Sequence, residues 1–412
     1  MLFWNRYTRN SNYGTDYDLN MMTAKGSLPT GTLGYYVKTG TTANKIQGAV
    51  NAAQSGDTIN VAKGTYKENV KIDKSLTVKG AGSTKTIIDG NQKGTVFLIG
   101  TNNHNVDVTL SSMVIQGGTG TSRYINGDLI GGGGIFNDQG TLTVKDCKII
   151  GNSVSGSNNV FAIGGGIFNN GGKIALTGST ISGNSVNAIG DGSALHQAAS
   201  GGGIYNHVGT VTIQQCMISQ NLAKGNKVDA NGGGISNFGG LVSISASTIS
   251  GNSATNNLGS ASGGGIWNFG TANVMGSTIS GNIANRGGGI ANSDTLTVTG
   301  STISGNTAKK SGGGGIRNDG TATLIGSQVS NNKASMNGGG IASNGTVTLT
   351  NSNVSENTAN YGGGIFVGYS STATLIGSQV SNNKASMNGG GIVAHRSQVT
   401  LTNTIVTKTL QT

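Results

Sequence analysis

The sequence predicts an all-β fold: a single-stranded right-handed parallel β-helix, which is a solenoid of stacked coils, with a short N-terminal capping helix. The first observation is a Gly-Gly-Gly-Ile tetrad that recurs ten times, at intervals of 24 to 37 residues. The second is an asparagine 16 to 18 residues after the isoleucine of each of the first nine tetrads. The third is a short alternating strand, such as Thr-Leu-Thr-Val, within the repeat. Repeats of this length indicate stacked units that share one core.

Composition agrees with this fold and excludes two others. Glycine is abundant at 74 residues, proline occurs once, and charged residues make up 10% of the 412. A collagen would need proline and a strict three-residue glycine period. A disordered chain would need more charge and fewer branched apolar residues. The composition therefore favours many short strands joined by tight turns.

The tetrad isoleucines are expected to form one inward column, because stacking places each copy over the previous one. They are Ile135, Ile167, Ile204, Ile235, Ile266, Ile290, Ile316, Ile341, Ile365 and Ile392. Two asparagine columns should form ladders in the turns, since asparagine favours turns and its amide can bond along the stack. The first comprises Asn152, Asn184, Asn221, Asn252, Asn282, Asn306, Asn332, Asn357 and Asn383. The second comprises Asn137, Asn169, Asn206, Asn237, Asn268, Asn292, Asn318 and Asn344, and ends at Val367 and Ala394.

The chain divides into a predicted mobile tail over residues 1–30 and a β-helix over residues 31–412. Within the β-helix, residues 31–130 form the cap and first coils, and residues 131–412 form the GGGI repeat coils. Ile46, Val50 and Ala53 lie at helical spacing, which predicts the capping helix. The strands expected before the first tetrad are 58–62, 69–72, 75–79, 86–89, 95–99 and 106–115.

The repeat motifs resemble those of polymorphic outer-membrane proteins. That family is marked by GGA-[ILV] and F-x-x-N, which appear here as GGGI and I-x-x-N over residues 131–408, for example at 181–184. The stretch 43–90 resembles the opening of pectin-lyase-like β-helix proteins, a superfamily that includes many polysaccharide-active enzymes. The two resemblances imply a parallel β-helix and an adhesin-like role.

The active-site motifs of the pectin-lyase-like enzymes do not occur in this sequence. The N-T-D, G-H-G and R-I-K motifs of polygalacturonases are missing, as are the R-x-P-x-x-R strand of pectate lyases and the esterase signatures. The sequence therefore predicts no catalytic residue, cofactor or metal. A glycosidase would need two carboxylates about 5 to 10 Å apart. Asp191 and Asp229 are the candidates if an acidic pair operates here.

The segments from ladder asparagine to next tetrad are longer in the early coils, where they span 14 to 20 residues against 8 to 10 in later coils. The excess is expected to form loops along one edge of the solenoid, and binding residues concentrate on loops carried by rigid scaffolds. Neutral drift in insertion length is the alternative. The ligand-binding candidates are Arg123, Tyr124, Asp128, Phe161, His196, Lys224 and Lys227.

These features favour a non-enzymatic, adhesin-like or structural solenoid that binds a polysaccharide or cell-surface glycan through its early loops. One alternative is a polysaccharide lyase or hydrolase with a non-standard acidic site. A second is ice binding through Thr-x-Thr pairs on one strand, although threonine also simply suits an exposed strand. The last four pairs lie on consecutive coils: Thr295/Thr297, Thr321/Thr323, Thr346/Thr348 and Thr372/Thr374.

Charge and hydropathy bear on partners and location. The net charge is +11, yet basic residues past position 130 occur singly, which argues against a nucleic-acid partner. No run of 18 apolar residues exists, so no membrane span is expected. The N-terminus has no defensible signal peptide, and the predicted location is the cell surface or the extracellular space. The oligomeric state is left open.

Two cysteines are predicted to be unpaired. Cys147 and Cys216 precede their ladder asparagines by five residues, and the coil that ends at Asn184 lies between them. Their separation is then about 9.6 Å by strand spacing, which exceeds the ~7 Å limit for a disulfide.

Overall fold

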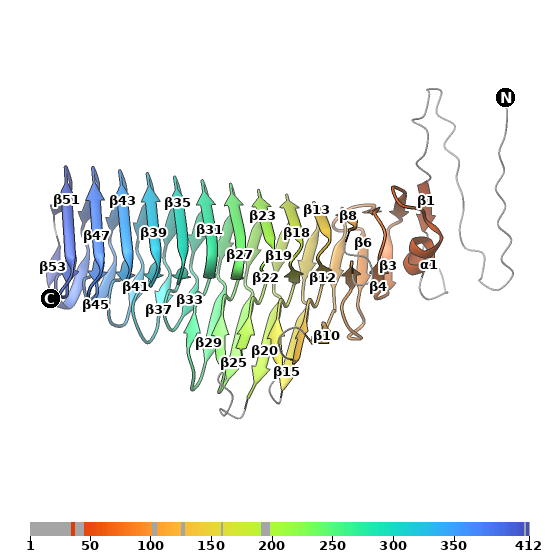
Figure 1. The fold of residues 1–412 in the computed structure, drawn as a ribbon, viewed down its shortest axis with the longest axis horizontal. Coiled ribbons are helices and arrows are strands. Elements are labelled where there is room, and N and C mark those ends of the chain that lie inside the picture. Colours follow the sequence, from red (N-terminus) through yellow and green to blue (C-terminus); the bar gives the residue numbers. More distant parts are fainter. Residues whose placement is uncertain are drawn as a thin grey trace, which may run out of the picture.

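The computed structural model describes residues 34–37, 45–100, 105–124, 128–157, 160–190, 198–407 and 409–411. These residues form a right-handed parallel β-helix whose coils stack along one straight axis (Figure 1). The predicted fold class is confirmed. The tail predicted over residues 1–30 lies outside the described residues.

Four sheets run along the solenoid, and we call them A to D. A typical coil gives two strands to sheet A, one to sheet B and one to sheet D. In the coil that follows the first tetrad these are β12 (Ile135–Asp138), β13 (Thr141–Lys145), β14 (Lys148–Ile150) and β15 (Ser153–Ser157). Sheet C exists in the early coils only, as β10 (Thr121–Tyr124), β11 (Asp128–Gly131), β16 (Phe161–Ile163), β21 (Ala198–Ser200), β26 (Asp229–Asn231) and β30 (Ala261–Ser262).

Sheet A takes a first and a second strand from most coils. Its first strands after β12 are β17 (Ile167–Asn170), β22 (Ile204–His207), β34 (Ile290–Asn292), β38 (Ile316–Asn318), β42 (Ile341–Ser343), β46 (Ile365–Val367) and β50 (Ile392–Ala394). Its second strands after β13 are β18 (Lys173–Thr177), β23 (Thr210–Gln214), β35 (Thr295–Thr299), β39 (Thr321–Ile325), β43 (Thr346–Thr350), β47 (Thr372–Ile376) and β51 (Gln398–Thr402). In two coils the pair merges into one long strand, β27 (Ile235–Ser245) and β31 (Ile266–Met275).

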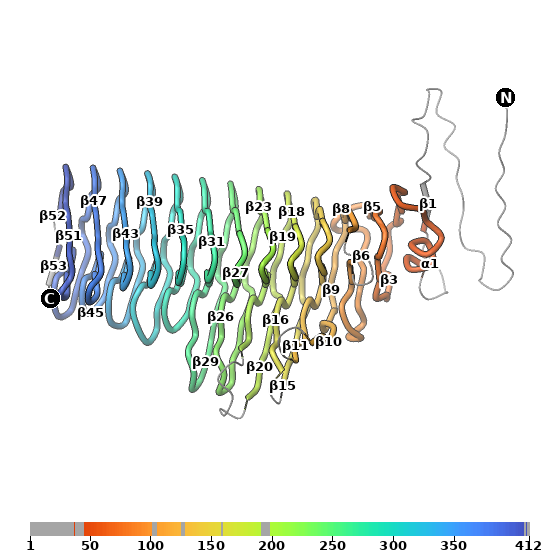
Figure 2. Tube along the Cα trace, viewed as in Figure 1, coloured from red at the N-terminus to blue at the C-terminus, as the bar shows by residue number. Residues whose placement is uncertain are grey.

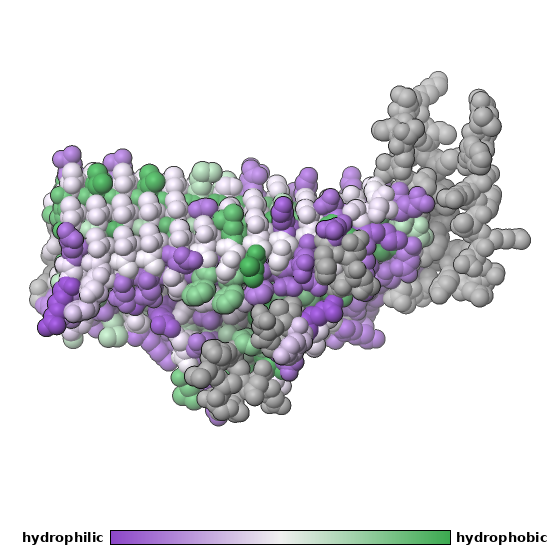
Figure 3. All heavy atoms as spheres, in the orientation of Figure 1, coloured by the Kyte–Doolittle hydropathy of each residue, from purple (hydrophilic) through white to green (hydrophobic). Residues whose placement is uncertain are grey.

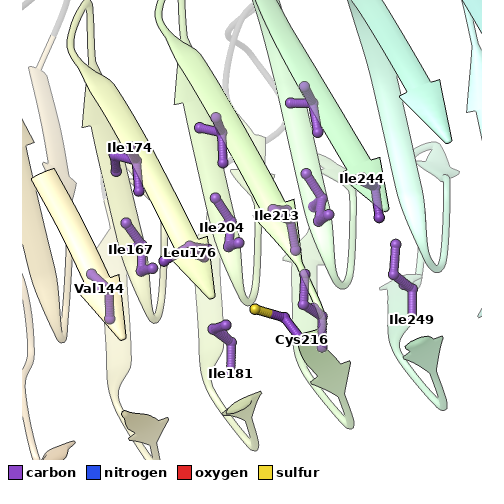
Figure 4. Packing of buried hydrophobic residues seen from close by; sticks show 14 of the residues in the cluster. Val144, Ile167, Ile174, Leu176, Ile181, Ile204, Ile213, Cys216, Ile244 and Ile249 are labelled. Carbon is purple, nitrogen blue, oxygen red and sulfur yellow. The ribbon is translucent and has the colours of Figure 1, made fainter. Parts of the chain in front are cut away.

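The predicted isoleucine column is confirmed. Each tetrad isoleucine pairs in parallel register with the next, from Ile135 to Ile392. The first nine are fully buried. Figure 4 shows the resulting apolar filling, in which Ile167 and Ile204 lie side by side on paired strands of successive coils.

The glycines of the tetrad make this close stacking possible. Gly201 has φ +68°, a left-handed conformation that glycine adopts without strain. A Cβ on Gly202 would lie 2.5 Å from the carbonyl oxygen of Gly233 in the next coil, so only glycine fits there. The repeated glycines therefore serve the backbone.

The first asparagine ladder is confirmed along its whole length. In each step the side-chain Nδ2 of one asparagine donates to Oδ1 of the next, for example from Asn221 to Asn252 at 3.0 Å. The same Oδ1 accepts from the backbone N–H of Asn221 at 3.0 Å. Each amide also reaches a backbone carbonyl in the preceding coil. These buried groups are satisfied, and they hold the coils in register.

The second ladder differs from the prediction at its C-terminal end. It runs from Asn137 to Asn318, but Asn318 Nδ2 then donates to the hydroxyl of Ser343 at 3.0 Å and not to Asn344. The ladder position is the second residue after the tetrad isoleucine, which is Ser343. Asn344 is exposed at the turn. The column then ends at Val367 and Ala394, as predicted.

The N-terminal end is closed by α1 (Lys45–Ala52), which buries Ile46, Ala49 and Val50 over the first coils. The carboxylate of Glu68 accepts hydrogen bonds from the backbone N–H groups of Ile46 and Gln47 at about 3 Å. A carboxylate at this position satisfies free N–H groups of the first helical turn. The predicted capping helix is confirmed. Within the described residues α1 is the one helix, and it is too short to cross a membrane.

The prediction that the long segments of the early coils form loops is wrong, because these segments form strands. They fold back as β15/β16, β20 (Ser185–Ile189)/β21, β25 (Leu222–Asn226)/β26 and β29 (Ser253–Asn256)/β30. We call these four strand pairs the ridge, and Figure 2 shows it projecting from the stack of coils. Its two sheets, C and D, enclose a separate core of small residues, including Val186, Ala199 and Ala230. Small residues at alternate positions allow sheets C and D to pack closely face to face, and this packing explains why the segments form regular strands.

Candidate functional site

Seven rings form a row on the outer face of sheet A, next to the ridge. They occupy the first and third positions after the tetrad isoleucine, which point outward because the isoleucine and the ladder asparagine point inward. We call them the aromatic row: Phe136, Phe168, Tyr205, His207, Phe238, Trp267 and Phe269.

The rings follow one another along the solenoid axis, and every neighbouring pair is nearly parallel except Phe168 and Tyr205, which are tilted by 55°. The centroids of Phe136 and Phe168 are 4.6 Å apart, and those of Phe238 and Phe269 are 5.5 Å apart. Trp267 lies within 6.4 Å of Phe238 and 6.0 Å of Phe269, and the rings are nearly parallel in both pairs. Strand geometry fixes this arrangement, because neighbouring rings lie either on adjacent paired strands or two residues apart on one strand, as Trp267 and Phe269 do.

Exposure of the row rises along the chain. Phe136 and Phe168 are buried, whereas Phe238 and Phe269 are 41% and 49% exposed. Tyr205 and Trp267 are intermediate. The exposed part of the row therefore lies on β22, β27 and β31, over an axial length of about 10 Å by strand spacing. Apolar surface gathers where the ridge meets the body of the solenoid (Figure 3).

Sheet C of the ridge forms the wall that faces the row. Leu129 and Ile163 of this wall pack against Phe136 and Phe168 of the row. Farther along, the wall positions in register become polar: Ser200, Asn231 and Ser262. The aromatic row and sheet C thus meet in a corner. At its N-terminal end the corner is filled by apolar side chains. At its other end the sheet C wall is polar.

Two arginines stand at the ends of this corner. The guanidinium carbon of Arg123 lies 5.7 Å from the ring centroid of Phe136, a cation–π contact. Its Nε is shielded from solvent and has no hydrogen-bond partner among the described residues. At the other end, Arg286 donates from Nε to the hydroxyl of Ser262 at 2.8 Å and from its terminal nitrogen to Ser260. Neither arginine pairs with a carboxylate within the described part of the chain.

A polar chain approaches the row from three successive coils. Asn170 Nδ2 donates to Asp138 Oδ1 at 2.8 Å, and Asn170 Oδ1 lies 3.1 Å from Nδ1 of His207. A carboxylate only accepts, so the Asn170 amide nitrogen faces Asp138 and its oxygen accepts from Nδ1–H of His207. Burial lowers the pKa of His207 below its usual value of 6.5. The imidazole is therefore neutral at pH 7, with the proton on Nδ1 and a lone pair on Nε2.

Comparison with solved structures finds β-helix proteins at low identity. The A-module of a mannuronan C-5 epimerase from Azotobacter vinelandii is 13% identical, over 88% of this chain and 93% of that chain, with a TM-score of 0.47. Pectate lyase Pel9A is 12% identical, over 90% and 79%, with a TM-score of 0.38. An alginate lyase from Paenibacillus is 14% identical, over 88% and 99%, with a TM-score of 0.34.

The strand pairing of this chain by itself defines the fold as a right-handed parallel β-helix. At these identities the likeness concerns the fold alone. No protein-family model matches the chain, and no curated protein matches it significantly.

The β-helix brings some of the sequence-derived candidates to the corner. Alternation along β10 and β11 places Arg123 on the same side as Leu129, facing the row. Phe161 packs against the same apolar cluster. Asp229 also projects from the row side of sheet C, and its Oδ1 accepts from the backbone N–H of Ser260 at 3.0 Å.

The other candidates are not in the corner. Tyr124 and Asp128 pair with each other on the opposite side of sheet C. Lys224 is exposed on sheet D, the far face of the ridge, and Lys227 lies exposed in the turn at the ridge tip. Asp191 and His196 fall outside the described residues. Asp128 and Asp229 lie three strand steps apart, about 14 Å, too far for a glycosidase pair.

The aromatic row was missed by the sequence analysis, although its signal was present. The third, fourth and fifth tetrads read GGGIYNH, GGGISNF and GGGIWNF, with aromatic or imidazole rings at the outward positions. Later tetrads, from GGGIAN onward, have rings at these positions only at Phe366 and His395. Counting rings by position in the repeat would have located the row.

Proposed function

We propose that this protein binds a polysaccharide without chemical change, in the corner between the aromatic row and the ridge. The observation that supports the proposal most directly is the exposed stack of Phe238, Trp267 and Phe269. Contiguous exposed apolar side chains on a soluble protein mark an interaction site. The adhesin-like role expected from the sequence is kept as part of this proposal.

The chemistry of the corner fits a sugar chain. A sugar ring has an apolar C–H face and a rim of hydroxyls, so it combines flat stacking on a ring with hydrogen bonds at its edge. The row offers the flat surface, and Ser262 and Asn231 offer polar groups on the facing wall. A site lined by aromatic side chains with a few placed polar groups is typical of small-molecule and glycan recognition.

The direction of the row favours a chain over a single sugar. The rings follow the solenoid axis across successive coils, so a linear polymer can contact several of them at once. Polysaccharides of this kind occur at cell surfaces and outside cells, and we infer that the protein acts there.

The deciding experiment separates binding from turnover. The protein is applied to a panel of immobilised polysaccharides, and bound protein and released oligosaccharides are both measured. Retention on at least one polysaccharide with no release of shorter or unsaturated products is expected. Release that scales with protein concentration would contradict the non-enzymatic part, whereas absence of retention on every glycan would contradict the binding part.

A second candidate function is polysaccharide cleavage with His207 as the proton acceptor, and the Asp138–Asn170–His207 chain favours it. A neutral imidazole oriented through Nδ1 has the form that general-base catalysis requires. His207→Phe would preserve the stack with Tyr205 and Phe238 while removing the base. If cleavage occurs, this variant should lose product release but keep retention, and Asp229→Asn tests the acidic alternative in the same assay.

A further inference from the structure

A second surface, which differs in chemistry from the aromatic row, lies on the later coils of sheet A. The strands of those coils place threonines in two parallel columns. The first column is Thr271, Thr295, Thr321, Thr346 and Thr372. The second column is Thr297, Thr323, Thr348, Thr374 and Thr400. We call the two columns the threonine face.

The threonine hydroxyls and methyls project outward. The residues between the columns, Leu296, Ala322, Val347 and Ala373, are buried with at most 1% exposure, so the alternating threonines point to solvent. Thr295, Thr321 and Thr346 are exposed. Among the described residues, only Thr295 uses its hydroxyl on a protein group, the carboxylate of Asp294 at 3.2 Å. The other hydroxyls of the face are left for an external partner.

The central strands of the face are uncharged and carry no ring, and the charged and aromatic neighbours lie at its edges: Asp294 beside Thr295, and Phe269 two residues before Thr271. None of the residues of β35, β39, β43 and β47 is charged or aromatic. Figure 3 shows regular rows of side chains of intermediate hydropathy over the later coils, in contrast to the mixed surface nearer the N-terminus. The corresponding early strands are interrupted, for example by Lys173 and Leu241 in the first column.

The spacing of the face is fixed in two dimensions. Neighbouring strands lie about 4.8 Å apart, and alternate residues along a strand lie about 6.7 Å apart. Two internal ladders hold successive coils in register directly behind it. One is the second asparagine ladder, in which Asn292 and Asn318 donate from Nδ2 to the backbone carbonyls of Thr321 and Thr346. The other is a serine ladder in which the hydroxyls of Ser327, Ser352 and Ser378 accept from the backbone of the preceding coil.

We propose that the threonine face binds ice. A rigid lattice of hydroxyls can enter the hydrogen-bond network of ordered water. The methyl beside each hydroxyl cannot hydrogen-bond, so the water around it bonds to other water molecules and stays ordered between the hydroxyls. On the four central strands a charged ligand finds no counter-charge, and a glycan finds none of the rings on which sugars stack. A periodic, uncharged lattice of water is the partner that the surface fits, independently of the proposed function of the aromatic row.

The test measures inhibition of ice recrystallisation and thermal hysteresis with the full chain. Wild-type protein should keep ice grains small and shape growing crystals. The double variant T323Y/T348Y places two bulky rings at the centre of the face and should abolish both effects. A second variant, T321K/T346K, introduces charge at two exposed positions and should do the same, so that misfolding of one variant does not decide the outcome. Thermal unfolding of each variant is measured in parallel.

The matched control is T143Y/T212Y, the same substitutions in the same column of the early coils, outside the threonine face. It should retain full ice activity. Absence of ice activity in the wild type, or undiminished activity in folded T323Y/T348Y and T321K/T346K, would overturn the proposal. Retention on crystalline cellulose that both variants abolish, with no ice activity, would assign the face to a polysaccharide surface and would likewise overturn it.

Discussion

The rings of Phe136 and Phe168 stack with their centroids 4.6 Å apart, close to the spacing between neighbouring strands. Phe136 pairs with Phe168 in parallel register, so the β-helix itself sets the ring separation. The same register continues from Tyr205 to Trp267, where the row becomes exposed. A surface built in this way has the rigidity of the core behind it, which reduces the ordering cost of binding.

Trp267→Ala should weaken polysaccharide binding by roughly tenfold or more, because truncating an aromatic anchor of a binding site costs about 2 kcal/mol or more. The measurement is the dissociation constant for whichever polysaccharide the panel identifies. Phe366→Ala is the matched control, since Phe366 occupies the same repeat position on a later coil, away from the row. Equal effects of the two substitutions would place the site elsewhere.

Ile290→Asp should unfold several neighbouring coils. Ile290 is fully buried between Ile266 and Ile316, and an uncompensated buried charge costs several kcal/mol. Thermal denaturation followed by circular dichroism checks this. Thr295→Asp, at an exposed position of the same coil, should leave the melting temperature almost unchanged.

Asn252→Ala should destabilise the fold by about 1–3 kcal/mol or more, because it leaves buried donors and acceptors of the ladder without partners. Asn344→Ala should be nearly neutral, since Asn344 lies outside the ladder that Ser343 continues. Chemical denaturation of both variants measures the difference. A large loss at Asn344 would contradict the register of the second ladder.

Cys147 and Cys216 should titrate as two thiols only after denaturation. Ser179 lies between them: its hydroxyl accepts from the Cys147 backbone at 3.1 Å, and its N–H faces Cys216 Sγ at 3.4 Å. Both thiols are free, as predicted, and burial raises the pKa of Cys147 to about 12. Native protein at about pH 8 should therefore react slowly with thiol reagents. Finding no thiol in unfolded, unreduced protein would contradict the two-coil separation.

Stability should fall as the pH drops through about 6.5, in part through His207. Its folded-state pKa lies below the usual value, because burial disfavours the charged imidazole. The unfolded state then takes up a proton that the folded state refuses, so the free energy of unfolding decreases until the pH reaches the folded pKa. His207→Phe should flatten this part of the profile, as measured by denaturation midpoints between about pH 5 and pH 8. An unchanged profile would remove His207 as a contributor.

The sequence by itself determined the fold, because each coil repeats the same pattern of residues. The tetrad glycines, the inward isoleucines and the ladder asparagines recur at nearly constant offsets, so one coil implies the next. The same logic predicted the free cysteines. The prediction was wrong at Asn344, because the ladder position in that coil is one residue earlier and is occupied by Ser343.

Only the tertiary structure decided where the functional surface lies. The long early segments have no repeat to constrain them, and whether they form loops or strands depends on the Ala- and Val-lined packing of sheet C on sheet D. That packing turns Arg123 toward Phe136 and sends Lys224 to the other face of the ridge. Neighbours in sequence therefore separate by strand alternation, whereas rings about 30 residues apart become neighbours through parallel stacking, and neither relation is local along the chain.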